Sequence, residues 1–266
     1  MTASQAFRAD LDVARQLAIL ACDIALHYFH RGVSADTKPD GTPVTVADRE
    51  IEQTLLGALT RFRPEDAVLG EEFGARGASS RRWVLDPIDG TSNFVSGNSQ
   101  WGTHVALEVD ERIVLGVITR PAQGLSWWAC RGCGAYRSEI APGSTDVRLH
   151  VSTRAELSAS RVTVWTNESD PVLDRLRRQT QWVEPSLDAI LRLAEGGLEA
   201  VIDRSGKPWD HAPAVVLVEE AGGTFSDSSG GHRVDRGEGR FSNGLIHAEL
   251  NALLERSQRM NVPFTS

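Results

Sequence analysis

The sequence has few cysteines, no excess of basic residues and no long apolar run, and each of these absences excludes a class of protein. Its 266 residues include three cysteines, Cys22, Cys130 and Cys133. They are too few for a disulfide framework, and their odd number fits a reducing compartment. The formal net charge of −8 argues against nucleic-acid binding, which rewards clustered lysine and arginine. No apolar run approaches the roughly 20 residues that cross a bilayer, and the first residues lack the pattern of a signal peptide. We therefore expect a cytoplasmic protein without membrane or nucleic-acid partners.

Cys130 and Cys133 form a Cys-x-x-Cys pair within the segment ACRGCGAY. A zinc site would need two more soft ligands, and the sequence offers neither a second such pair nor two histidines at finger-like spacing. We interpret the segment as a glycine-rich hairpin turn that carries two thiols. A metal or redox role is the alternative.

The apolar and charged fractions, 41% and 24%, are typical of a globular protein. The length suits one large α/β domain or two tightly joined halves. Residues 5–31 and 45–62 have the apolar spacing of helices, and the second begins with a TVAD capping box. AVLG and WVL predict strands, and THVALEV, IVLGVIT and LSWWACR predict an antiparallel meander.

Beyond about residue 145 strands and helices alternate, which favours an α/β arrangement. We therefore expect an α/β fold whose first half, residues 1–143, is α+β and whose second half, residues 144–266, is α/β. The junction is predicted near APGSTD, residues 141–146.

Five acidic residues stand where a predicted strand ends or a helix begins. They are Asp48 in the capping box, Glu71 after AVLG, Asp86 and Asp89 in WVLDPIDGTSNF, and Asp210 in WDHAPAVVLVEEAGG. Each of them alone could be a turn residue or a helix cap. Together they occupy positions that converge on one crevice in open α/β sheets. For Glu50, Glu52 and Asp66, in contrast, an exposed position is sufficient explanation.

Clustered carboxylates repel one another unless a cation joins them. Oxygen ligands suit Mg²⁺, and the absence of nearby histidine or cysteine argues against zinc. Two such ions about 3.5–4 Å apart bind the attacking and leaving oxygens of a phosphoryl displacement and acidify the nucleophilic water. Gly90 permits a tight turn with exposed amides, and a helix that starts near Thr91 would add a favourable dipole for phosphate. These residues predict metal-dependent hydrolysis of a phosphomonoester.

The motifs PVTVAD, GEE, WVLDPIDGT and WDHA, in this order, resemble the inositol monophosphatase family of metal-dependent phosphatases over nearly the whole chain. The resemblance implies a layered αβαβα fold, a homodimer, two or three Mg²⁺ ions and inhibition by lithium. It also implies a small phosphorylated metabolite as the partner.

The family pattern assigns roles to individual residues of this chain. Glu71 and Asp86, with the carbonyl of Ile88, resemble the first metal site, and Asp86, Asp89 and Asp210 resemble the second. Asp48 and Thr91 match the pair that orients and helps deprotonate the attacking water, and with Glu71 they form the predicted catalytic set. The predicted substrate contacts are Ile88, Asp89, Gly90, Thr91, Ser186, Asp203 and Asp210.

Within the family, TKPDGTPVT, RPEDAVLGEEFG and WWACRGCGA resemble most the bacterial histidinol-phosphate phosphatases of histidine biosynthesis. This implies hydrolysis of L-histidinol phosphate to histidinol and phosphate. Two features depart from that pattern. Asp203 replaces a substrate-reading glutamate, and residues 183–186 replace a tyrosine, glycine and aspartate, so that Glu184 or Ser186 could supply the missing contact. An inositol-1-monophosphatase or broad sugar-phosphate phosphatase is therefore the alternative, and a catalytically silent scaffold of the same fold is a second one.

Overall fold

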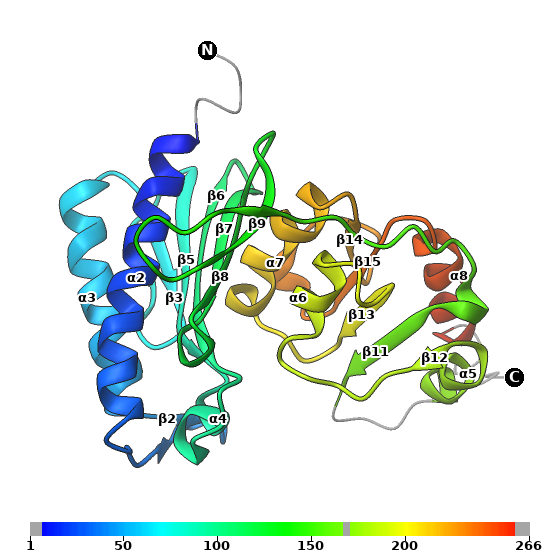
Figure 1. Cartoon of the computed structure of the whole chain (residues 1–266), viewed down its shortest axis with the longest axis horizontal. Coiled ribbons are helices and arrows are strands. Elements are labelled where there is room, and N and C mark those ends of the chain that lie inside the picture. Colours follow the sequence, from blue (N-terminus) through cyan, green and yellow to red (C-terminus); the bar gives the residue numbers. More distant parts are fainter. Residues whose placement is uncertain (1–6, 167–170, 259–266) are drawn as a thin grey trace, which may run out of the picture.

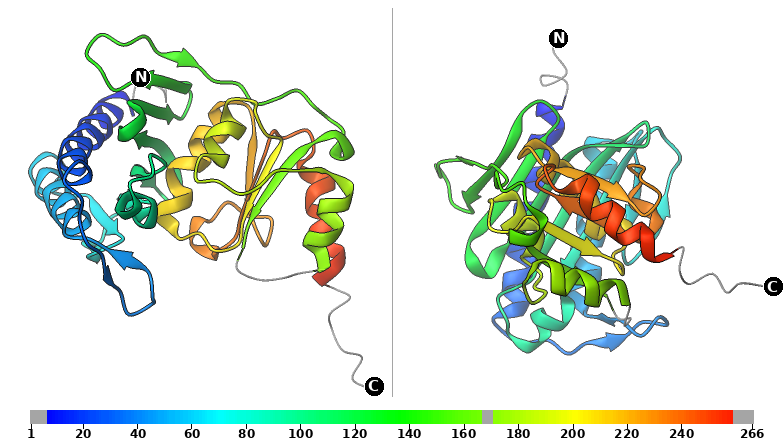
Figure 2. Two further views of the ribbon diagram at one scale, coloured as in Figure 1. Left: turned by 60° about the horizontal axis from the view of Figure 1, so that its bottom comes forward. Right: turned by 90° about the vertical axis from the view of Figure 1, so that its right-hand side faces the viewer.

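The structure is a computed structural model that describes residues 7–166 and 171–258, in which helices and sheets alternate as five layers (Figure 1). The first layer contains α2 (Arg8–Phe29) and α3 (Val46–Phe62), which cover one face of an eight-stranded sheet. Then come α6 (Ala189–Ala194) and α7 (Pro208–Glu220), a five-stranded sheet, and finally α5 (Pro171–Gln179) with α8 (His247–Gln258). The left view of Figure 2 shows the same order from a further direction, with α5 and α8 on the side opposite α2 and α3. The predicted αβαβα layering is confirmed.

The first sheet has the strand order β10-β9-β8-β7-β6-β5-β3-β4. β3 runs parallel to β5, and all other neighbours in this sheet are antiparallel. The predicted meander corresponds to β6, β7 and β8, and β9 extends it where the sequence predicts only a turn. The strands are β3 (Ala67–Gly70), β4 (Gly74–Arg76), β5 (Arg81–Asp89), β6 (Gly102–Val109), β7 (Arg112–Arg120), β8 (Leu125–Cys130), β9 (Gly134–Glu139) and β10 (Val147–Arg148).

The second sheet has the order β12-β11-β13-β15-β14. β11 runs parallel to β12 and β13, whereas β15 is antiparallel to both β13 and β14. Its strands are β11 (Arg161–Trp165), β12 (Gln181–Trp182), β13 (Ala200–Asp203), β14 (Thr224–Asp227) and β15 (Gly239–Ser242). A two-stranded ribbon, β1 (Asp36–Thr37) with β2 (Pro43–Val44), precedes α3, and the short helix α4 (Thr91–Ser96) follows β5. Single 3₁₀ turns are η1 (Pro121–Gln123), η2 (Leu157–Ala159) and η3 (Val234–Arg236).

Three apolar clusters fill the spaces between the layers. The middle cluster surrounds α7, whose residues from His211 to Val218 are all buried because the helix lies between the two sheets. On β7, a Cβ at Gly116 would lie 2.6 Å from the Cα of Pro213, so a glycine is needed for this close approach. The contact fixes α7, and with it Asp210, against the first sheet. No helix in the described ranges is both long and apolar enough to span a bilayer.

Two acids that the sequence pattern predicts to be exposed bind donors of the fold; Glu52 is buried and Asp66 is half-buried. Glu52 accepts hydrogen bonds from the backbone amides of Glu72, at 2.8 Å, and Phe73, at 2.9 Å. The side chain of Asp66 binds the guanidinium of Arg81 and the indole nitrogen of Trp83. The exposed-position interpretation is wrong for both residues, because each carboxylate satisfies donors that the fold buries.

Cys130 and Cys133 form a disulfide across the turn between β8 and β9, where their Cα atoms are 5.1 Å apart. The predicted hairpin turn is confirmed, but its two cysteines are joined as a disulfide instead of carrying two thiols. The hairpin brings the Cα atoms within the distance that a disulfide spans. Cys22 is free and buried.

Candidate active site

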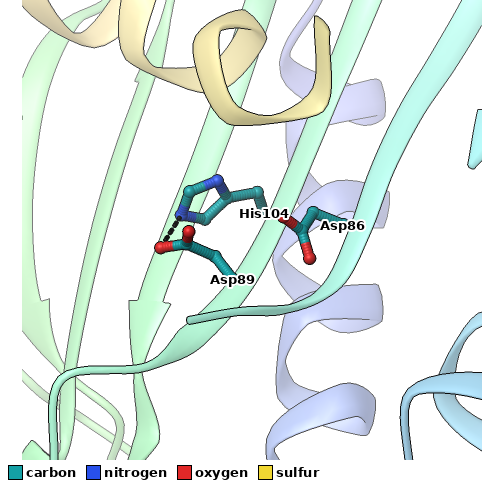
Figure 3. A group of neighbouring side chains, drawn as sticks. All are labelled: Asp86, Asp89 and His104. Atoms are coloured by element: carbon teal, nitrogen blue, oxygen red, sulfur yellow. Dashed lines mark ion pairs between the residues drawn. The ribbon is translucent and has the colours of Figure 1, made fainter. Parts of the chain in front are cut away.

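The end of β5 carries a β-bulge that brings Asp86 and Asp89 to the same side of the sheet. Side chains alternate along a strand, so residues three apart would normally point to opposite faces. Here Asp86 lies opposite His104 on β6 whereas Asp89 lies opposite Gly102, which inserts one extra residue into β5. The hydroxyl of Thr103 holds the bulge by donating to the carbonyl of Pro87 at 2.8 Å. Figure 3 shows Asp86, Asp89 and His104 gathered below α7.

Asp86 is buried, and its Oδ1 has no hydrogen-bond partner among the described residues. Burial and the neighbouring charges of Glu71, Asp89 and Asp210 raise its pKa well above the usual value. Burial and the charge of Asp89 likewise raise the pKa of Asp210 to about 6. A buried carboxylate without a donor, surrounded by others, is the environment that a divalent cation would satisfy. The donor set therefore fits a metal.

Asp89 has two neighbours, a histidine and an arginine, that the sequence analysis missed. Its Oδ2 lies 3.2 Å from Nε2 of His104 and 3.3 Å from Nη2 of Arg120. Burial acts to raise the pKa of Asp89, but these two side chains outweigh it and lower the pKa. The guanidinium of Arg120 also bonds to Oδ1 of Asp188 at 2.8 Å and to the carbonyl of Leu187 at 3.0 Å. It thereby ties the second half of the chain to the first sheet.

The sequence did contain a signal for these two neighbours, because side chains alternate between the two faces along each strand of the predicted meander. The side chains of Ala106 on β6 and Ile118 on β7 belong to the cluster that faces α7. His104 and Arg120 lie two residues from them, on the same face. The argument against zinc assumed that no histidine lies near the acids. That assumption is wrong.

Glu71 follows β3 and lies next to β5 because the two strands are parallel neighbours. Its Oε1 accepts a hydrogen bond from Nζ of Lys38 at 2.6 Å, and Oε1 of Glu72 accepts another at the same distance. Burial raises the pKa of Glu72 to about 7. Gly70, the last residue of β3, leaves room for the buried carboxylate of Glu52. A Cβ at residue 70 would lie 1.9 Å from Oε1 of Glu52.

Asp48 and Thr91 meet, as the family pattern implies. Asp48 is fully buried in the first turn of α3, where its Oδ2 accepts from the amide of Thr45 at 2.8 Å and from its hydroxyl at 2.6 Å. The hydroxyl of Thr91 lies 3.3 Å from Oδ1 of Asp48 and 3.2 Å from the carbonyl oxygen of Ile88. Burial raises the pKa of Asp48. Gly90, with φ of 82°, makes the left-handed turn before α4.

A cavity of about 180 Å³ lies beside these acids, between the end of β5 and the second half of the chain. Four predicted site residues line it: Asp89, Ser186, Asp203 and Asp210. The lining does not include the predicted residues Asp48, Glu71, Asp86, Ile88, Gly90 and Thr91. The sequence analysis missed several lining residues, which are His104, Trp165, Leu187, Ala189, Ile190, Ser205 and Gly206.

The carboxylate of Asp203 is engaged by its own chain. Its Oδ1 accepts hydrogen bonds from the amides of Ser205 and Gly206, each at 2.9 Å, and its Oδ2 lies 3.2 Å from Nε2 of His211. Burial opposes ionisation, but His211 and these donors lower the pKa of Asp203. The shorter acid thus closes the turn between β13 and α7.

Comparisons with known proteins agree with this architecture. The inositol monophosphatase family model matches residues 8–259. A Streptomyces griseus protein named glucose-1-phosphate thymidylyltransferase is 44% identical, with 85% of this chain and 88% of that protein covered. A histidinol-phosphatase of Streptomyces coelicolor is 36% identical, with 93% and 97% covered. The inositol monophosphatase structure from Thermotoga maritima superposes with a TM-score of 0.80 at 26% identity, covering 95% of this chain and 98% of that one.

The chain therefore belongs to the inositol monophosphatase family. It is a phosphoric monoester hydrolase of the metal-dependent kind.

Proposed function

We propose that this enzyme hydrolyses L-histidinol phosphate to histidinol and phosphate in the cavity between the end of β5 and the start of α7. The observation that carries the proposal is the convergence of Asp86, Asp89 and Asp210 from two halves of the chain, with no donor to the buried Oδ1 of Asp86 in the part of the chain that the structure describes. The relatives named histidinol-phosphatase, which match most of the chain at 36–38% identity, support the choice of substrate.

In this proposal Glu71, Asp86 and the carbonyl of Ile88 would hold one metal ion, and Asp86, Asp89 and Asp210 would hold the second. When bound, such ions would acidify the attacking water and neutralise charge on the phosphate oxygens. Mg²⁺ is the ion that carboxylate and carbonyl oxygens favour.

The remaining chemistry falls to Asp48 and the turn at residues 90–91. Asp48 would fix the hydroxyl of Thr91 and thereby orient the water that this hydroxyl binds. Because burial raises its pKa, Asp48 is suited to accept the proton that this water releases through Thr91. The backbone amides of Gly90 and Thr91 would donate to the phosphate.

A sugar phosphate is the second candidate substrate. The Streptomyces griseus relative is named for glucose 1-phosphate, and Asp203 is already engaged by Ser205, Gly206 and His211. An amine-bearing substrate would then depend on other acids, such as Asp210, or on Ser186 and Glu184. A polyhydroxylated substrate would not need the contact with the substrate amine that Asp203 no longer offers.

A phosphate-release panel with Mg²⁺, with and without lithium, tests these alternatives. We expect histidinol phosphate to give a higher kcat/KM than inositol 1-phosphate, glucose 1-phosphate or fructose 1,6-bisphosphate. Asp86→Asn should lower kcat/KM at least about 100-fold, since the loss of several kcal/mol of charge stabilisation has that effect. Asp23→Asn, on the exposed side of α2, is the matched control.

A preference for a sugar or inositol phosphate would replace the proposed substrate by the alternative. Absence of turnover with all substrates, despite bound metal, would support the scaffold. Homodimeric assembly and cytoplasmic residence stay predictions, which size-exclusion chromatography with light scattering and cell fractionation would test.

A further inference from the structure

His104 is a histidine inside a cluster of carboxylates. His104 is 6% exposed, and it lies opposite Asp86 in the register of β5 and β6. One potential ligand atom from each of His104, Asp86 and Asp89 lies within 4.8 Å of the other two. Figure 3 shows the imidazole directed toward the carboxylate of Asp89, with Asp86 beside it.

Three buried polar atoms of this group have no hydrogen-bond partner among the described residues. They are Oδ1 of Asp86 and both ring nitrogens of His104, Nδ1 and Nε2. Nε2 of His104 lies 3.2 Å from Oδ2 of Asp89, and this contact joins the ring to the acids. Buried polar groups without partners are rare in folded proteins and indicate a missing ligand or ion.

The charge of Arg120 explains why a metal beside Asp89 could take a neutral nitrogen ligand. Arginine stays charged in proteins, and its guanidinium lies 3.3 Å from Oδ2 of Asp89. The same oxygen therefore already has a permanent cation beside it. A metal at this position would gain less from Asp89 than from an unpaired carboxylate, and a nitrogen donor would complete its ligand set.

We propose that His104 is a nitrogen ligand of the second metal position, beside Asp86 and Asp89, and that this position prefers divalent transition ions over Mg²⁺. The proposal rests on the proposed function, because it assumes that these acids hold metal. Imidazole is a good ligand for transition ions, whereas Mg²⁺ favours oxygen ligands in octahedral geometry. The metal preference of this chain would then differ from that of an all-oxygen site.

The test is pulsed electron paramagnetic resonance of the full-length protein with Mn²⁺ added at substoichiometric amounts. We expect echo modulation from a coordinated ¹⁴N nucleus in the wild type and its loss in His104→Leu. His27→Gln changes an exposed histidine on α2 and should retain the signal. Titration should show Mn²⁺ affinity falling about 10- to 100-fold in His104→Leu, the range seen when groups that support a metal are removed. Mg²⁺ affinity should change by less than about threefold.

The outcomes separate this inference from the proposed function. Mn²⁺ bound without nitrogen modulation in the wild type would overturn the role of His104 and leave the oxygen-ligand site intact. An equal loss of Mn²⁺ and Mg²⁺ affinity in the variant would overturn the metal preference. Failure of the wild type to bind either ion would overturn both proposals. The wild-type spectrum decides the ligand question even if His104→Leu does not fold, and His104→Gln provides a polar replacement.

Discussion

Replacing Arg120 by methionine removes a buried cation that contacts both Asp89 and Asp188. Arg120 is 1% exposed and lies within 3.3 Å of four oxygen atoms, which also include the carbonyls of Thr119 and Leu187. Removal of one partner from a buried ion pair costs about 3–5 kcal/mol because the other charge is left buried and unpaired. We expect Arg120→Met to lower the free energy of unfolding by about 4 kcal/mol in the presence of a chelator.

Urea unfolding, followed by both circular dichroism and tryptophan fluorescence, measures this loss. Combining Arg120→Met with Asp188→Asn should give a coupling energy of about 1–3 kcal/mol, since the two side chains bond directly. Arg137→Met is the control, because its ion pair with Glu195 is 38% and 28% exposed. A pair of that kind contributes at most about 1 kcal/mol.

The reasoning would be refuted if Arg120→Met were no more destabilising than Arg137→Met. Additive effects of the Arg120 and Asp188 substitutions would also contradict it, because they would show that the guanidinium does not join the two halves. If the reasoning holds, Arg120→Met should raise KM more than it lowers kcat, since Leu187 and its neighbours line the cavity.

Three further predictions concern stability. Gly70→Ala should lower the free energy of unfolding by about 1–3 kcal/mol in thermal unfolding, because its Cβ would displace the carboxylate of Glu52. The control is Gly57→Ala, where the Cβ has open space, and it should raise the free energy of unfolding by up to about 1 kcal/mol. Burial acts to raise the pKa of Asp227, but hydrogen bonds from Ser229 and backbone amides lower it from 3.8 to about 2. The contribution of Asp227 to the free energy of unfolding is therefore complete above pH 3.8 and lost as the pH falls through 2. Asp227→Asn should cost about 2 kcal/mol in urea unfolding at pH 7 and progressively less in acid, and an equal cost at pH 7 and pH 2 would contradict this. A chelator should lower the Tm of metal-loaded protein, because metal at 100 times its Kd adds about 2.7 kcal/mol; an unchanged Tm would argue against bound metal.

The layered fold was predictable because its signals are local. The helix spacing of α2 and α3, the apolar run of β3 and the meander are patterns within single segments, and each corresponds to an element of the structure. The junction predicted at residues 141–146 stays a prediction. β10 follows that segment in sequence and pairs with β9 in the first sheet.

The site was predictable where a short motif carries the residue. Asp86 and Asp89 share one motif, although the bulge that places them on the same side of the sheet appears only in the structure. His104, Arg120 and Trp165 carry no motif. The alternation of the meander indicates only that His104 and Arg120 share the face of Ala106 and Ile118. Their proximity to the acids, and that of Trp165 to the cavity, depends on strand register and on how the two sheets face each other, which one sequence does not specify. Glu52 was misjudged for a related reason, since the donors that it satisfies belong to a turn some 20 residues away.

Helix α7 has no polar side between His211 and Val218, and this has a consequence for how the enzyme could be redesigned. Any change of side-chain volume there would disturb two sheets at once and shift Asp210 with them. Residues 183–186, in contrast, are half-buried or exposed, lie outside regular helices and strands, and precede the two residues that bind Arg120. An engineer could exchange this segment to alter the substrate while leaving the hydrolytic machinery in place.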